Sequence, residues 1–263
     1  MNNMKATYWK IREEMPRWIS DLRKDPPSQR MYRHIQTRFR RTIELGGLAI
    51  RLSPDMGSKA VAYMLSGAYE RPERRIIDYA LEKGDRVLEL GTGIGYLSAL
   101  CARKIGSDRV FTYEANPLLR ARIAETYSLN GVSPHVEFCM LGERAGETSF
   151  YVTPEFWSST TVYRRGKARR ISVPVKEVNE VLAKHSPNFL IIDIEGGEAD
   201  LVRYMRLDGI NKVCIELHPY VIGITAEQRV RDFFIRQGFC EDGTVSDEEH
   251  VFYRRDDMAL RSL

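Results

Sequence analysis

The segment Arg86–Gly95, RVLELGTGIG, constrains the fold of this chain more than any other. Its apolar half predicts a buried parallel strand, and the three glycines that follow permit a tight turn into a helix. Glycine also lets the backbone approach a ligand where a Cβ atom would collide. A strand, a glycine loop and a helix in this order predict the start of an open α/β sheet that holds a small molecule at the loop.

From this segment onward, apolar strands alternate with helical patterns. We expect strands at 86–90, 109–114, 135–140, 188–194 and 210–217, and helices at 95–105, 117–129, 176–184, 197–206 and 226–237. Two further apolar segments, GFCE and HVFYRR, predict an antiparallel hairpin at the sheet edge. The alternation predicts a mostly parallel, seven-stranded sheet with right-handed crossovers and helices on both faces. Strand-like pieces at 149–152 and 171–175 interrupt this order and bracket a long loop.

The first part of the chain has a different pattern. We expect residues 1–70 to form an N-terminal helical extension and a hairpin, and residues 71–263 to form the main domain. The hairpin is predicted at 43–52, and helices are predicted at 58–66 and 72–82. An apolar stripe at helical spacing, between residues 8 and 22, would pack on the main domain or on a second subunit of a homodimer, and the alternative is a helix that binds a membrane surface or a partner.

The charge of the chain is concentrated in this extension. The net charge is +4, and residues 1–51 hold twelve Lys or Arg against five Asp or Glu. Such patches are more often solvated surface than nucleic-acid sites. The four cysteines form no CxxC pair, and no apolar run is long enough to cross a membrane. We therefore expect a soluble cytoplasmic protein with reduced thiols and no membrane insertion.

The spacing of the glycines indicates which small molecule is bound. A dinucleotide fingerprint has a third glycine at the position of Tyr96, which disfavours a nicotinamide dehydrogenase. Glu89 precedes the loop, and Glu114 closes the next strand about 20 residues on, where an acid can bind ribose hydroxyls. This pattern resembles the S-adenosylmethionine (SAM) site of the Rossmann-like methyltransferases.

A second motif lies in the segment NFLIIDIEGGEADLV. It has the form DxEGxE, carried here by Asp193, Glu195, Gly196 and Glu198. With YERPERRI at 69–76 and CIELH at 214–218, the two motifs resemble the FkbM-like family of SAM-dependent, class I methyltransferases over roughly residues 43–254. Val178 and Asn179 stand where that family usually has a Leu-Asp pair, and we interpret this as a variation in helix packing.

The resemblance implies a Rossmann-like methyltransferase fold, SAM as the cofactor, and O-methylation of a hydroxyl on a small molecule such as a sugar, a glycoside or a polyketide-type natural product. The residues expected to bind the cofactor are Glu70, Glu89, Gly91, Thr92, Gly93, Gly95, Tyr96, Glu114, Ala115, Asn116, Leu141, Gly142 and Asp193.

Ligands of open α/β sheets bind beyond the carboxyl ends of the strands, where this chain carries acids and one histidine. His218 is the expected general base, because its ordinary pKa lies near neutrality, and Asp193 or Glu216 would orient or replace it. Glu198 lies in a first helical turn, where an acid is favourable without a catalytic role. The expected substrate-binding residues are Glu195, Trp157 and Ser158.

Other functions remain as alternatives. Acids at this edge would also suit a divalent metal, but they bind sugar hydroxyls equally well, and no metal is expected. A nucleic-acid methyltransferase would use the basic extension, yet DIEG stands where base-methylating enzymes carry Asn or Asp, two prolines and an aromatic residue. A non-catalytic binding module is disfavoured by the intact glycine loop and Glu114.

Overall fold

The computed structural model describes residues 42–53, 56–152 and 169–255. In chain order the described strands are β1 (Thr42–Leu45), β2 (Leu48–Arg51), β3 (Val87–Leu90), β4 (Val110–Tyr113), β5 (His135–Glu137), β6 (Met140–Gly142), β7 (Gly146–Val152), β8 (Arg169–Glu177), β9 (Phe189–Ile192), β10 (Lys212–Glu216), β11 (Cys240–Glu241) and β12 (His250–Arg254). The described helices are α4 (Gly57–Ser66), α5 (Arg71–Ala80), α6 (Tyr96–Ile105), α7 (Arg120–Asn130), α8 (Val178–His185), α9 (Glu198–Leu201), α10 (Pro219–Ile222) and α11 (Ile224–Arg236), with single 3-10 turns η2 (Ser107–Arg109) and η3 (Pro117–Leu119).

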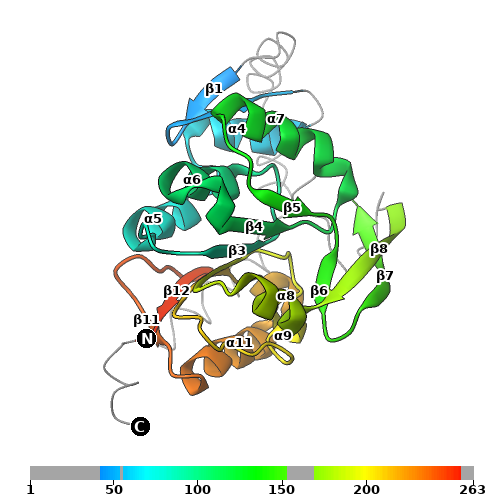
Figure 1. The fold of residues 1–263 in the computed structure, drawn as a ribbon, viewed down its shortest axis with the longest axis vertical. Helices are drawn as coiled ribbons and strands as arrows, with labels where there is room; N and C mark the ends of the chain where they lie inside the picture. Colours follow the sequence, from blue (N-terminus) through cyan, green and yellow to red (C-terminus); the bar gives the residue numbers. More distant parts are fainter. Residues whose placement is uncertain (1–41, 54–55, 153–168, 256–263) are drawn as a thin grey trace, which may run out of the picture.

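The predicted seven-stranded sheet is confirmed, in the order β11-β12-β10-β9-β3-β4-β5 (Figure 1). The five strands from β10 to β5 are parallel to one another, whereas β12 is antiparallel to both β10 and β11. The edge hairpin is therefore confirmed as well. All carboxyl ends of the parallel strands meet at one edge of the sheet.

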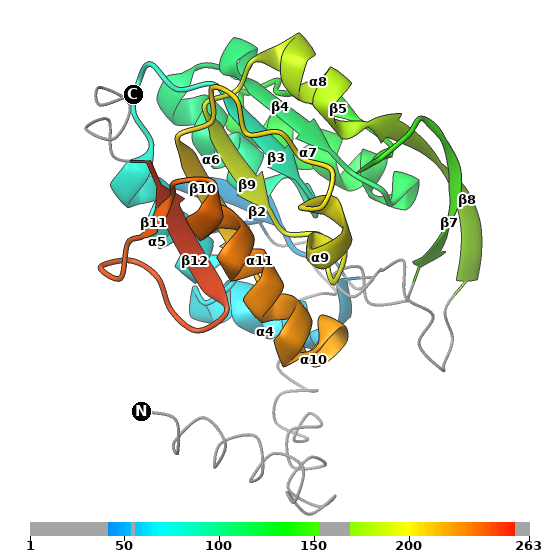
Figure 2. The same cartoon turned by 90° about the horizontal axis from the view of Figure 1, so that it is seen from below.

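Two apolar cores lie on opposite faces of this sheet. Because side chains alternate along a strand, Phe189 and Ile191 of β9 pack in one core and Leu190 and Ile192 pack in the other. Helices α4, α5, α6 and α7 cover the first face, and α8, α9 and α11 cover the second (Figure 2). None of the helices in the described ranges is long and apolar enough to cross a bilayer.

The hairpin predicted at 43–52 is confirmed as β1 and β2, paired antiparallel around Gly46 and Gly47. Both glycines have positive φ values, as a two-residue hairpin turn requires. Asn130, at the end of α7, accepts a hydrogen bond from the backbone N–H of Ala49 and donates one to its carbonyl. The hairpin thus shares the first core with the main domain. The helices predicted before it lie outside the described residues.

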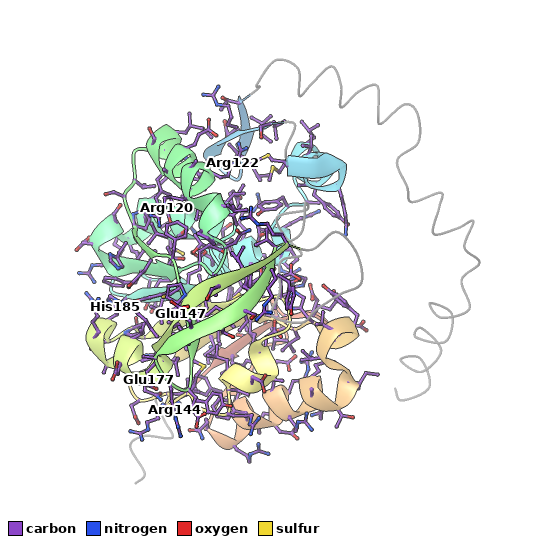
Figure 3. The ribbon with its side chains drawn as sticks, turned by 90° about the vertical axis from the view of Figure 1, so that its right-hand side faces the viewer. Arg120, Arg122, Arg144, Glu147, Glu177 and His185 are labelled. Carbon is purple, nitrogen blue, oxygen red and sulfur yellow. The ribbon has the colours of Figure 1, made fainter. Side chains whose placement is uncertain are left out.

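One predicted strand, 135–140, is wrong as a single element. The chain leaves the main sheet after β5, whose partner β4 ends at Tyr113, and its next residues form β6. Strand β6 pairs parallel with β8, and β8 pairs antiparallel with β7, in a separate three-stranded sheet. The two strand-like pieces predicted at 149–152 and 171–175 are confirmed within it. Figure 3 shows β7 and β8, with Glu147 on β7, beside the sheet.

The helix predicted at 197–206 is also shorter than expected, since α9 ends at Leu201. Asn179, at the start of α8, donates a hydrogen bond to the carbonyl of Tyr204 and accepts one from the N–H of Arg206. These bonds engage backbone groups that a longer helix would have used. The Val-Asn departure from the family pattern therefore has a defined contact with the loop after α9.

Candidate active site

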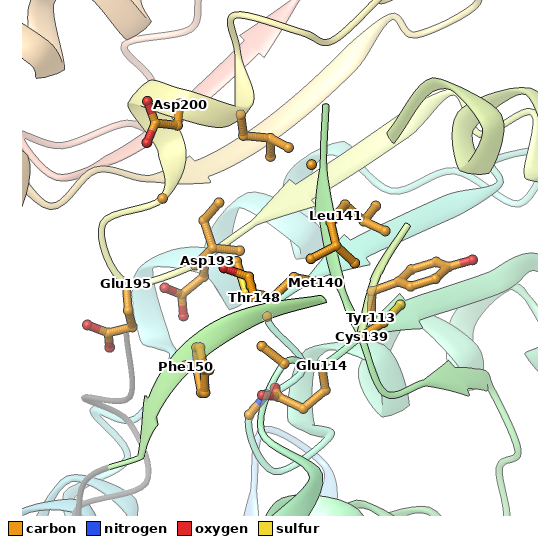
Figure 4. Close-up of a pocket in the computed structure, with 18 of the residues that line it drawn as sticks. Tyr113, Glu114, Cys139, Met140, Leu141, Thr148, Phe150, Asp193, Glu195 and Asp200 are labelled. Carbon is orange, nitrogen blue, oxygen red and sulfur yellow. The ribbon is translucent and has the colours of Figure 1, made fainter. Parts of the chain in front are cut away.

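A cavity of about 440 Å³ opens at the carboxyl edge of the sheet, between the strand ends and the small sheet of β6, β7 and β8 (Figure 4). Its volume lies within the range of small-molecule sites. The expected site residues that line it are Glu70, Gly91, Gly93, Glu114, Ala115, Leu141, Gly142, Asp193 and Glu195. Most of the predicted cofactor contacts thus meet in one place.

The surroundings of the loop after β3 explain why it carries glycine. Gly91 has φ +89°, and a Cβ atom placed on it would lie 1.6 Å from the carbonyl oxygen of Asp193. The tips of β3 and β9 are therefore close enough that no side chain fits between them. A Cβ on Gly93, at φ +55°, would meet nothing nearer than the Tyr69 hydroxyl at 3.6 Å. Gly93 thus presents bare backbone to the cavity.

Glu114 joins the glycine loop to the end of β4. Its Oε2 accepts a hydrogen bond from the N–H of Gly93 at 2.9 Å, and its Oε1 accepts one from the N–H of Asn116 at 2.7 Å. Burial raises the pKa of this carboxyl to about 7, although the backbone hydrogen bonds oppose the rise. Each carboxylate oxygen retains a lone pair, so Glu114 can still accept hydrogen bonds from two vicinal ribose hydroxyls.

Five residues expected to bind the cofactor do not line the cavity, namely Glu89, Thr92, Gly95, Tyr96 and Asn116. Glu89 is 1% exposed and accepts a hydrogen bond from Thr112 at 2.5 Å, and burial raises its pKa to about 8. The Tyr96 hydroxyl hydrogen-bonds to the carbonyl of Leu45 in the hairpin. Glu89 and Tyr96 support the loop from behind.

The three remaining residues, Asn116, Thr92 and Gly95, also make contacts with other parts of the protein. The side chain of Asn116 accepts a hydrogen bond from the N–H of Leu118 and so begins the turn η3. Thr92 hydrogen-bonds to Thr112. A Cβ on Gly95 would approach Tyr127 to 2.9 Å, so this glycine permits close packing of α6 and α7.

The acceptor end of the site is strongly acidic. Asp193 follows β9, Glu216 ends β10, and His218 lies between them in space. The imidazole of His218 is 1% exposed, and its Nδ1 lies 2.7 Å from Oε1 of Glu198. Its Nε2 faces Asp193, Glu195 and Glu216 at 3.6 to 3.7 Å. The structure therefore gathers Asp193, Glu195 and Glu216 around His218, together with Glu198, whereas Glu89 lies apart from them.

Burial and mutual repulsion shift the titration of these groups. Burial and the neighbouring acids raise the pKa of Glu70 and Glu216 well above the ordinary range, and burial raises that of Asp193 to about 6. Burial opposes charge on His218, but the hydrogen bond with Glu198 and the charge of Asp193 raise its pKa to about 9. The imidazole thus balances part of the acidic charge. Asp193 and Glu195 line the cavity, whereas Glu216 and His218 lie behind them.

The backbone of the site is strained at two of its acids. Glu70 and Glu195 have φ values of +48° and +53°, and both line the cavity. Among the described residues, Ser186 is the one other non-glycine residue with a positive φ. Such conformations cost about 1–3 kcal/mol and gather at functional sites. The next residue, Gly196, has no room for a Cβ, which would lie 2.5 Å from Val221.

Sequence reasoning missed Glu73 and His250, which form a second ion pair at this edge. Nε2 of His250 lies 3.1 Å from Glu73 and 3.6 Å from Glu216. The motif YERPERRI contains Glu73, but its place in a helix gave no sign of burial. The cavity walls from β7, with Thr148 and Phe150, were also missed, because the small sheet was not foreseen. Trp157 and Ser158 lie outside the described residues.

A seven-stranded sheet of this order, with a glycine loop after β3 and an acid at the end of β4 that binds the loop, defines a Rossmann-like, SAM-dependent methyltransferase. The model of the methyltransferase FkbM domain matches residues 89–239, which is more than half of the chain. The chain belongs to this family, and SAM is its cofactor.

Similar proteins differ in what they methylate. Over 82 residues the chain is 28% identical to the protein-lysine N-methyltransferase EFM3 of Chaetomium thermophilum, a match that covers 31% of this chain and 24% of that protein. The chain thus spans about a quarter of the length of this relative. Similar structures are a methyltransferase from Pyrococcus furiosus (14% identity, TM-score 0.44, 87% of this chain and 98% of that chain) and the O-methyltransferase TomG from Streptomyces achromogenes (13%, 0.43, 87% and 99%).

Proposed function

We propose that this methyltransferase transfers the methyl group of SAM to a hydroxyl of a small molecule, such as a sugar, a glycoside or a polyketide-type natural product. One observation carries the proposal. A single cavity joins the glycine loop and Glu114 to the acids Asp193 and Glu195. A nucleotide-like cofactor held at the first end would meet an acceptor held at the second.

The charge of the cavity supports a hydroxylated acceptor. Its described lining contains the carboxylates of Glu70, Glu114, Glu143, Asp193, Glu195 and Asp200, and no Lys or Arg. Phosphodiester substrates need cationic partners, so this lining disfavours a nucleic acid. Carboxylates accept hydrogen bonds from adjacent hydroxyl groups, which are the groups a polyol presents in number.

Methyl transfer to a hydroxyl requires that the methyl donor and the acceptor are aligned and that the hydroxyl loses its proton. When bound, SAM supplies an activated methyl group on a sulfonium, and the departing thioether needs no acid. Asp193 lies at the junction of the two ends, and its Oδ1 is buried without a hydrogen-bond partner. The side chain as a whole is 21% exposed and lines the cavity, so its other oxygen, Oδ2, would accept the hydrogen bond of the acceptor hydroxyl. Apolar side chains such as Phe150 and Leu141 line the rest of the cavity and exclude water, and good orientation alone contributes about 7–11 kcal/mol.

A screen of hydroxylated small molecules with isotopically labelled SAM tests the proposal. We expect label in an ether, located by mass spectrometry and NMR, and transfer slowed by about 100-fold or more in Asp193→Asn. The matched control is Glu147→Gln, an exposed acid on β7 outside the cavity. Methylation of amines or RNA, with hydroxyls untouched across the screen, would refute the assignment to oxygen.

A further inference from the structure

The orientation of His218 is fixed from behind. Its Nδ1 lies 2.7 Å from Oε1 of Glu198, a side chain that is 0% exposed. The same oxygen accepts the N–H of Gly196 at 3.0 Å, so Glu198 is itself held in place. A carboxylate that binds one imidazole nitrogen leaves the lone pair of the other directed away from it. This is the arrangement by which proteins orient a histidine toward a metal ion.

The free side of the ring faces three carboxylates from two strand ends. Nε2 lies 3.7 Å from Oδ1 of Asp193, 3.7 Å from Oε2 of Glu195 and 3.6 Å from Oε1 of Glu216. These separations are too long for hydrogen bonds. They are a few tenths of an ångström longer than the 3.0 to 3.4 Å, roughly, that separates neighbouring ligands at right angles around an ion bound at about 2.1–2.4 Å. Side-chain movements of a few tenths of an ångström would bring these atoms to the spacing of ligands around an ion.

A second observation points to a missing partner. Oδ1 of Asp193 is buried, makes no hydrogen bond, and faces the imidazole. The ligand atoms of Asp193, Glu216 and His218 all lie within 4.8 Å of one another. Buried polar atoms are normally satisfied, and the orphaned carboxylate oxygen lies too far from the imidazole for a hydrogen bond, so a cation bound between the two groups would take the place of the proton on Nε2.

In the neighbouring cluster of Glu73, Glu216 and His250 the possible ligand atoms are similarly close together, but the imidazole has different contacts. Both ring nitrogens of His250 already have partners, Nε2 with Glu73 at 3.1 Å and Nδ1 with Asp247 at 2.9 Å. An imidazole held between two carboxylates acts as a counter-ion and has no nitrogen left for a metal. This difference selects the His218 cluster.

We propose that Asp193, Glu216 and His218 form a divalent-cation site at the acceptor end of the cavity, with Glu195 beside it and Glu198 as a positioning residue. A mixed set of imidazole nitrogen and carboxylate oxygen suits a first-row ion such as Mn²⁺ better than Mg²⁺ or Ca²⁺. The ion would lie behind Asp193, where it would balance part of the acidic charge and hold in place the carboxylate that faces the acceptor hydroxyl. Its catalytic role rests on the methyl transfer proposed above, whereas its binding does not.

Binding of Mn²⁺ to the chelator-treated, full chain tests this site, measured by calorimetry and by the EPR signal of free Mn²⁺. We expect one ion per chain, and affinity reduced by about 10- to 100-fold or more in His218→Gln and Asp193→Asn. Glu198→Gln should cost about tenfold. The matched control is His135→Gln, an exposed histidine on β5 whose loss should leave the affinity within about threefold of the wild type, and His250→Gln tests the neighbouring cluster. Thermal unfolding reports that each variant is folded.

The outcomes separate this site from the proposed function. Absence of Mn²⁺ binding, equal binding in His218→Gln, or loss in His250→Gln with retention in His218→Gln would each overturn the cation site. Methyl transfer to a hydroxyl that persists undiminished in excess chelator would overturn the catalytic role of the ion and leave the proposed function standing. Mn²⁺ binding that follows the expected variants, without transfer to any hydroxyl, would support the site and overturn the function.

Discussion

Replacing Glu114 with Gln tests the cofactor site most directly. The carboxylate accepts hydrogen bonds from the N–H groups of Gly93 and Asn116, and the residue lines the cavity. A Gln side chain keeps one acceptor oxygen and presents an NH₂ group to the other backbone donor. The variant therefore loses one ribose acceptor, loses the charge, and sets two donors against each other in the loop.

The size of the effect follows from these contacts. A hydrogen bond to a charged group contributes about 1.5–3 kcal/mol. Loss of one such bond, with a disturbed loop, should cost about 2–3 kcal/mol, or roughly a 30- to 150-fold weaker binding of SAM. The pKa of about 7 adds a second signature. Because protonation removes an acceptor, wild-type affinity should fall about tenfold from pH 8 to pH 6, and Glu114→Gln should lack this dependence.

Calorimetry with SAM at pH 6, 7 and 8 measures both effects, and thermal unfolding confirms that the variant is folded. Glu147→Gln removes one exposed carboxylate of the same domain and should bind SAM like the wild type. An unchanged dissociation constant in folded Glu114→Gln would refute the assignment of this residue to the ribose. A pH dependence equal in both proteins would refute the ionisation argument alone.

Three further changes test the supporting structure. Gly91→Ala should abolish SAM binding in any protein that folds, because its Cβ has no room beside the carbonyl of Asp193; near-normal calorimetric affinity would contradict the close approach. Glu89 has its folded pKa raised from 4.5 to about 8, so its stabilising contribution is present below pH 4.5 and is lost as the pH rises through 8. In urea unfolding, the free energy of unfolding of the wild type should fall by about 3 kcal/mol between pH 6 and pH 9, and that of Glu89→Gln should not. An equal pH dependence of this free energy in the two proteins would contradict the burial argument. Lys212→Met leaves the buried carboxylate of Asp85 without its cation at 3.0 Å and should cost about 3 kcal/mol, an effect that Lys212→Met should lose in an Asp85→Asn background.

Patterns within short segments determined the fold class and half of the site. Short, nearly continuous apolar runs predicted β3, β4, β9 and β10, and the glycines after β3 predicted the turn at which the cavity opens. Glu114 was predicted because the end of a parallel strand has a fixed place in such a sheet. These features depend on residues close in sequence, whose conformations are set by local sterics and by alternation of burial.

Only the tertiary structure decided which of the acids line the cavity and which are buried behind it. Glu89 lies within β3 and Glu114 directly follows β4, but Glu89 is buried behind the loop and Glu114 lines the cavity. His218 contacts Glu198 across twenty positions of sequence, and Glu73 on α5 contacts His250 on β12. Strand β6 does not belong to the main sheet, because the pairing of β5 with β4 ends at Tyr113 and β6 pairs with β8 instead. Burial, pairing and pKa depend on which distant segments come together, and that is set by packing of the whole chain.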